Sequence, residues 1–198
     1  MYTIRNEQDQ YILEKSDQPL LTPRGESVRT THQILADRLL ADLRKHGEDP
    51  SDPVSMVAFH YPMIDFFNVA PRVELEHSIA IGLDRENDWT FNCPTATPEP
   101  MMRWMGFFGT HSTRAEQGKK WLSTLSLIQL CAVCVVGRVT ESVNIPFTVA
   151  SEQLSEKEIV EYAKVINEFY PYLSTRDLTQ ILKNFLFYFN LEKLSANG

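Results

Sequence analysis

Cysteine is scarce in this 198-residue chain, which contains only 3. An odd number of cysteines cannot form a complete disulfide framework, so we expect the protein to work in a reducing compartment. Cys131 and Cys134 have the spacing of a redox or zinc motif, but they lie within an apolar segment. Because buried free cysteine packs like a small hydrophobic residue, we interpret the pair as part of the core.

Glycine is also scarce, at 8 residues, and the glycine-rich loops that cradle phosphate groups are missing. Neither a P-loop nor a GxGxxG turn occurs, so we expect a role that does not consume nucleotide. Positive charge is in deficit as well, since 19 basic residues stand against 26 acidic ones and give a net charge of −7. Binding to nucleic acid would need a basic stripe, and we predict no nucleic-acid partner.

A hydrophobic run long enough to cross a membrane is missing too. The uncharged segment 121–137 is shorter than the roughly 20 apolar residues of a spanning helix, and it contains serine, threonine and glutamine. We therefore predict a buried core helix there and no membrane insertion. Residues 1–11 carry two acidic side chains and no apolar run, unlike a secretory or transit segment, so we expect a cytoplasmic location.

Hydrophobic periodicity and turn signals predict an α+β protein with a small β-rich N-terminal lobe and a mainly helical C-terminal lobe. We place the first lobe at residues 1–92 and the second at residues 101–198. The segment 93–100 contains three prolines and is the predicted hinge between them.

In the first lobe, residues 2–30 have the short apolar runs and turn residues of an antiparallel meander. Thr30 is predicted to cap the helix that follows, and Pro62 is predicted to interrupt the apolar segment around it. Residues 79–83 and 89–91 are expected to form two further short strands.

In the second lobe, capping signals and apolar periodicity predict a series of helices. These helices span residues 101–108, 113–136, 155–170 and 174–194. Gly137 is expected to end the second of them, Ser155 and Glu158 form a capping box for the third, and Ser174 or Thr175 caps the last. Residues 143–147 are expected to be extended.

Histidine provides no recognisable catalytic or metal-binding pattern. The 5 histidines are scattered and no HExxH motif occurs, so we predict no catalytic residue, no metal and no cofactor. One alternative stays open, in which the protein is a hydrolase or binds a small molecule. In that case His60, Asp65 and His77 would converge on a site between the two lobes.

Flexible and aromatic apolar side chains are abundant in the second half of the chain. They cluster in residues 101–108, and they surround the last predicted helix on almost every side. One core-facing stripe does not account for such a helix, which is either fully buried or in contact with another protein. If they bind a client protein, the contact residues are predicted to be Trp104, Met105, Phe107, Phe108, Phe185 and Phe189.

Two segments resemble a known family. Residues 18–25 read QPLLTPRG, residues 35–42 read LADRLLAD, and Ile64 with Asp65 follows after an Asp-Pro pair. This order resembles the ATP-twelve family, the assembly chaperones for the alpha subunit of F-type ATP synthase. The apolar segment that ends in Gly137 and Arg138 is similar to the family's late helix.

The resemblance implies a distant family member with a two-lobed fold and a nucleotide-independent role. Such a protein would hold a newly made subunit whose apolar contact face is still uncovered, with the ATP synthase alpha subunit as the candidate client. We therefore expect a protein-binding chaperone and not an enzyme. A structural subunit of a larger assembly is a third hypothesis.

Overall fold

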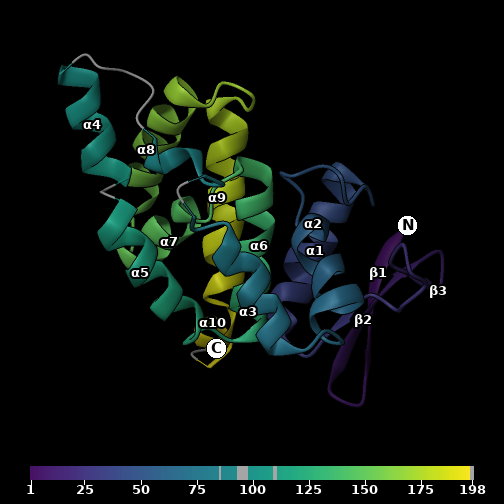
Figure 1. Cartoon of the computed structure of the whole chain (residues 1–198). Coiled ribbons are helices and arrows are strands. Elements are labelled where there is room, and N and C mark those ends of the chain that lie inside the picture. The colour runs from purple at the N-terminus through teal and green to yellow at the C-terminus, as the bar shows by residue number, and fades with distance from the viewer. Residues whose placement is uncertain (85, 93–97, 109–110, 197–198) are drawn as a thin grey trace.

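The computed structural model describes residues 1–84, 86–92, 98–108 and 111–196. A small antiparallel sheet precedes a mainly helical region, which confirms the predicted α+β class. Figure 1 shows the sheet at one end of the molecule. Of the predicted hinge, residues 93–97 lie outside the described residues. The division into two lobes stays a prediction.

The sheet is built around its second strand. Its strands are β1 (Tyr2–Glu7), β2 (Gln10–Lys15), β3 (Gln18–Pro19) and β4 (Arg29–Thr30). β2 pairs antiparallel with each of the other three. The two-residue turns after β1 and β2 place Asp9 and Asp17 at positive φ, as tight hairpins that match strand twist require.

Helix α1 (Gln33–His46) covers the sheet with one apolar face, and its Leu35, Leu39 and Leu43 are buried. The predicted cap at Thr30 is wrong, because the helix begins two residues later, after His32. The Thr30 hydroxyl instead accepts a hydrogen bond from the His32 backbone at 3.1 Å.

A proline-interrupted segment follows, as predicted. Helix α2 (Val57–Pro62) ends at the proline and runs directly into a π-helical turn, η1 (Met63–Phe67). Proline cannot donate a backbone hydrogen bond, so the regular helical pattern changes there.

The two strands predicted at 79–83 and 89–91 are wrong, because both segments are helical. Helix α3 (Arg72–Ile81) buries Ile79 while Ile81 is 52% exposed. A strand would place these two side chains on the same face. The second segment is the 3-10 turn η2 (Trp89–Phe91), which the buried Asp88 side chain caps by accepting from the Thr90 backbone at 3.0 Å.

The helical region continues to the end of the described chain. Its elements are α4 (Pro98–Phe108), α5 (His111–Leu122), α6 (Leu127–Thr140), α7 (Asn144–Ser151), α8 (Glu156–Phe169), α9 (Thr175–Phe189) and α10 (Leu191–Ala196). No helix among the described residues has the length and apolar character to cross a membrane.

The single helix predicted over residues 113–136 is wrong, because α5 and α6 are separate. Ser126 and Gln129 form a capping box that starts α6 afresh. Gly137 lies inside α6, and the helix ends where Glu141 adopts a left-handed conformation with φ of 53°.

The predictions for residues 143–147, Ser155 and Ser174 concern the starts of α7, α8 and α9. Residues 143–147 are not extended but belong largely to α7, where Pro146 lies in the first turn and needs no intrahelical donor. The capping box of Ser155 and Glu158 is confirmed at α8, and Ser174 caps α9 as predicted.

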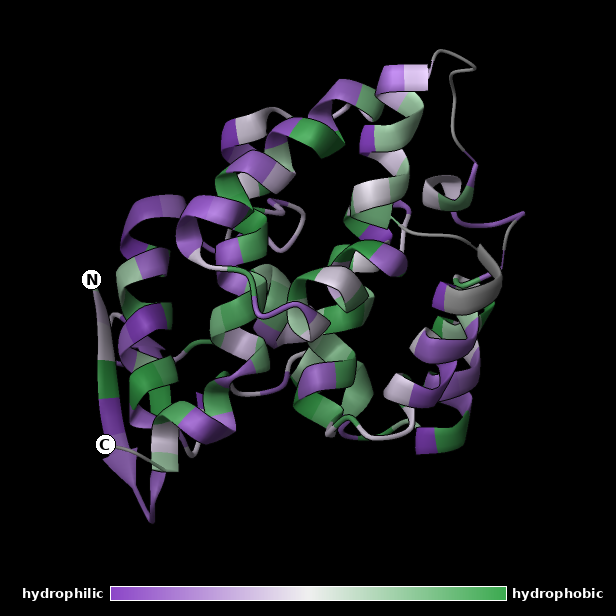
Figure 2. Ribbon diagram, turned by 90° about the vertical axis from the view of Figure 1, so that its left-hand side faces the viewer, coloured by the Kyte–Doolittle hydropathy of each residue, from purple (hydrophilic) through white to green (hydrophobic). Residues whose placement is uncertain are grey.

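One contiguous apolar core extends from the sheet to the last helices. Helix α6 lies in its middle and contacts α2, α3, α7 and α9. Figure 2 shows hydrophobic residues gathered on the central helices and hydrophilic residues on the outer turns. The core therefore joins segments that are far apart in the sequence.

We predict that two phenylalanines of opposite burial differ in their contribution to stability. Phe185 is fully buried, whereas Phe66 is 45% exposed. Phe185→Ala is expected to lower the free energy of unfolding by about 3–5 kcal/mol, because truncation leaves a cavity. Phe66→Ala is the matched control and is expected to cost about 1 kcal/mol or less. Urea unfolding measures both, and equal losses would contradict the burial described above.

Candidate functional site

The aromatic residues predicted to contact a client are mostly core residues. Trp104, Phe108 and Phe185 are 2% exposed or less, and Phe189 is buried as well. The indole of Trp104 packs edge-on against Phe169 at 4.7 Å between ring centroids. Phe108 packs against Trp89 and Tyr162, and Phe185 packs against Phe189. Of the two alternatives that the sequence left open, burial in the core therefore describes these four rings.

The two remaining residues of that set differ. Phe107 is half-buried against Tyr162, with 5.5 Å between ring centroids. Met105 is 47% exposed on the outer side of α4. The role of all six residues in client binding stays a prediction, and Met105 is the member of the set that solvent reaches most easily.

The residues of the alternative hydrolase hypothesis do not converge. His60 and Asp65 line one groove, whereas His77 lies exposed on α3 and does not line it. Each of the first two side chains is already engaged in a structural hydrogen bond. The structure therefore does not assemble the three groups into one site.

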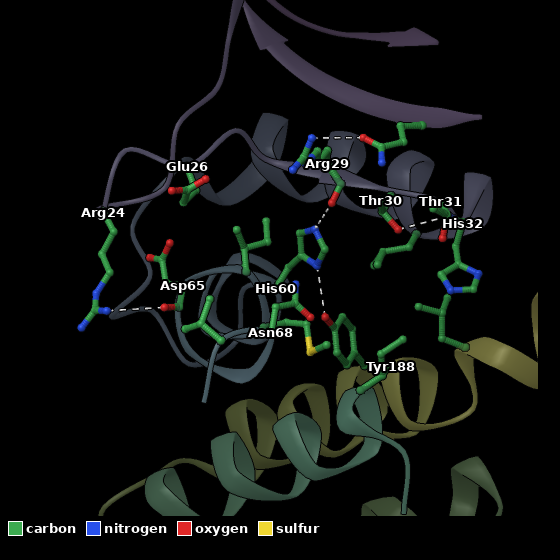
Figure 3. A pocket seen from close by; sticks show the side chains of 17 residues that line it. Arg24, Glu26, Arg29, Thr30, Thr31, His32, His60, Asp65, Asn68 and Tyr188 are labelled. Carbon is green, nitrogen blue, oxygen red and sulfur yellow. Dashed lines mark hydrogen bonds between the residues drawn. The ribbon is translucent and has the colours of Figure 1, made fainter. Parts of the chain in front are cut away.

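The groove that His60 and Asp65 line is the candidate functional site, and we call it the sheet–helix groove. It has a volume of about 690 Å³. Its walls come from the segment between β3 and α1, from α2 and η1, and from the junction where α9 ends and α10 begins. Figure 3 shows Arg24, Asp65, His60 and Tyr188 placed around it.

His60 ties two walls of the groove together (Figure 3). Its Nε2 lies 3.0 Å from the Arg29 carbonyl oxygen and its Nδ1 lies 3.1 Å from the Tyr188 hydroxyl. A carbonyl can only accept, so Nε2 carries the proton and Nδ1 accepts from tyrosine. Burial lowers the pKa of His60 to about 4, which keeps the ring neutral at pH 7.

Asp65 ties the loop before β4 to η1. Its buried carboxylate accepts a hydrogen bond from the Thr22 hydroxyl at 2.5 Å. The Arg24 guanidinium lies over the Phe66 ring at 3.9 Å from the centroid, in cation–π geometry. These contacts hold the loop against the helical wall.

Exposed apolar side chains lie on the two segments that these contacts join and on the chain that follows η1 into α3, and we call them the apolar rim. The rim consists of Leu21, Phe66, Val69 and Val73, which are 53%, 45%, 74% and 76% exposed. Val69 also lines the groove itself. The Thr22–Asp65 hydrogen bond joins the segments of Leu21 and Phe66, and Val69 and Val73 follow Phe66 in the chain. Exposed apolar side chains grouped in this way mark candidate sites of contact with other molecules.

No sequence pattern predicts that the rim residues and Arg24 lie together. Leu21 and Arg24 are unremarkable within their own segment, and only the tertiary contact between the loop and η1 brings them to Phe66. The cluster of Phe66, Phe67 and Val69 next to Asp65 was the one local signal.

Comparisons with known proteins identify the fold. No family model and no curated protein matches the chain. A solved structure does match, that of Atu1473, described as "a putative chaperone from Agrobacterium tumefaciens". The TM-score is 0.64 at 17% sequence identity, over 98% of this chain and 84% of that one. The two proteins share a fold. At 17% identity the likeness shows a common fold only. The activity has to be argued from the site.

We predict that His60 makes stability fall as the solution is acidified. The unfolded chain takes up a proton near pH 6.5, whereas the folded chain resists protonation until about pH 4. Between these pH values the unfolded state binds more protons than the folded state. The free energy of unfolding is therefore expected to fall by up to about 3 kcal/mol on acidification.

Urea unfolding of wild type and His60→Gln at pH 7.5 and pH 4.5 measures this contribution. The variant loses the titrating group, so its free energy of unfolding is expected to change less between the two pH values. An identical change in both proteins would show that His60 is not the group responsible.

Proposed function

We propose that this protein is a chaperone that binds a polypeptide client through the apolar rim, which meets the sheet–helix groove at Val69. The exposure of Leu21, Phe66, Val69 and Val73 is the observation that carries the proposal. The shared fold with a protein described as "a putative chaperone" supports it.

The energetic basis is the burial of apolar surface. Each Å² of apolar surface removed from water contributes about 25 cal/mol, and an unassembled subunit exposes such surface as well. Covering both surfaces in one complex removes them from water and prevents the client from aggregating. Arg24 and Arg29 lie at the same groove and offer polar contacts beside the apolar ones.

The likeness of residues 18–25 and 35–42 to the ATP-twelve family supports a finer proposal about the client. In that proposal the client is the alpha subunit of F-type ATP synthase. Residues 18–25 contain Leu21, so the resembling segment contributes to the apolar rim. The protein would then act by binding, without consuming nucleotide and without catalysis, and the client's native partner would displace it.

We predict that substitutions in the rim abolish client binding. Phe66→Asp combined with Val69→Asp places charge on the rim, and capture of co-expressed ATP synthase alpha subunit is expected to fall at least about tenfold. Ile81→Asp combined with Met102→Asp is the matched control, because both residues are exposed and apolar and neither belongs to the rim. Circular dichroism confirms that each variant is folded.

A second arm tests chaperone activity without assuming the client. Wild type is added to reduced insulin, whose B chain aggregates, and light scattering measures the suppression. Suppression without capture of alpha subunit would reject the proposed client alone. Failure of both would reject the chaperone function, and a rim variant that behaves as wild type would reject the rim.

A further inference from the structure

A second cavity lies apart from the groove and shares no lining residue with it. We call it the aromatic pocket, and its volume is about 500 Å³. Its walls come from η2, from α4 and from the chain that follows α8. The residues that matter for its chemistry are Glu86, Trp89, Trp104, Glu141, Tyr170 and Tyr172.

The aromatic rings of the pocket are held in a fixed arrangement. The indole N–H of Trp89 donates to the Thr140 carbonyl at 2.7 Å, which orients its ring. Tyr170 stacks on Trp89, with 5.2 Å between centroids and 12° between planes. The Trp89 ring also packs edge-on against Trp104, with 5.4 Å between the ring centroids. The pocket therefore has a preorganised aromatic wall.

Tyr172 extends this wall into solvent. Its ring packs edge-on against Tyr170 at 4.9 Å, yet 81% of the residue is exposed. A tyrosine in this position contributes little to the core, because nearly all of its surface stays in water. Its ring is instead available to a molecule that enters the pocket.

The charged side chains that line the pocket are acidic. Glu86 and Glu141 are exposed at its edge, and none of the described lining residues is basic. Glu141 follows α6 in a left-handed conformation that sets its direction. Burial and then the neighbouring Glu141 carboxylate raise the pKa of Tyr170, which places this carboxylate close to the aromatic wall.

We propose that the aromatic pocket binds an organic cation, an alkylammonium or guanidinium group, between Tyr172, the Trp89–Tyr170 stack and Glu141. The faces of aromatic rings attract cations, and the attraction strengthens when the cation is desolvated. The two carboxylates add attraction for positive charge and disfavour anions. The same chemistry is presented by a free small molecule and by a lysine or arginine side chain of a protein.

Calorimetry and NMR of the full chain test the proposal. Choline and a pentapeptide with a central arginine are titrated at constant ionic strength. The uncharged carbon isostere of choline and the citrulline form of the peptide serve as controls. Either cation is expected to bind and to shift the Trp89 indole N–H signal, and the uncharged counterparts are expected to bind at least about tenfold more weakly. Binding of choline would identify a free small molecule as the source of the cation, and binding of the arginine peptide would identify a protein side chain.

Variants locate the binding. Tyr172→Ala is expected to weaken binding about tenfold, whereas Tyr172→Phe retains the ring and is expected to bind as wild type. Glu141→Gln is expected to weaken binding several-fold, and Glu192→Gln on α10 removes an exposed acid elsewhere as the matched control. No binding of either cation, equal binding of the uncharged counterparts, or unchanged binding in Tyr172→Ala and Glu141→Gln would each overturn the proposal.

Discussion

The packing of α6 against α9 is the interaction on which the rest of the structure depends. Both helices bury apolar side chains in the middle of the core, and α6 also contacts α2, α3 and η1 from the first half of the chain. Through Tyr188, α9 bonds His60 of α2. Ile128 of α6 and Tyr188 of α9 both line the sheet–helix groove, so the position of this groove depends on the packing of these helices.

This packing determines where apolar surface is left for partners. Large aromatic rings of the second half of the chain, such as Phe185 and Trp104, are buried, so they stabilise the core and do not face solvent. The exposed apolar side chains instead include those beside η1, where the Thr22–Asp65 hydrogen bond fixes the loop. Of the apolar rim, Leu21 lies in a segment that resembles a chaperone family, and Phe66 directly follows the Ile64–Asp65 pair of that resemblance.

Features that depend on near neighbours could be predicted. The capping box of Ser155 with Glu158, the cap at Ser174 and the break at Pro62 follow from contacts within about one helical turn. Residues 79–83 could not be assigned in this way, because a short apolar run suits a strand and a helix equally well. Only the burial of Ile79 and Leu83 beside an exposed Ile81 decides for the helix.

By itself, the sequence determined the α+β class, the N-terminal antiparallel meander, the caps at Ser155 and Ser174 and the excess of acidic charge, since these depend on composition and on local hydrogen bonding. Tertiary structure alone decided which aromatic rings are buried, and it brought Arg24 to Phe66 and Trp89 to Tyr170. Such pairs join residues remote in the chain, and their contact depends on how complete helices pack, which no local pattern encodes.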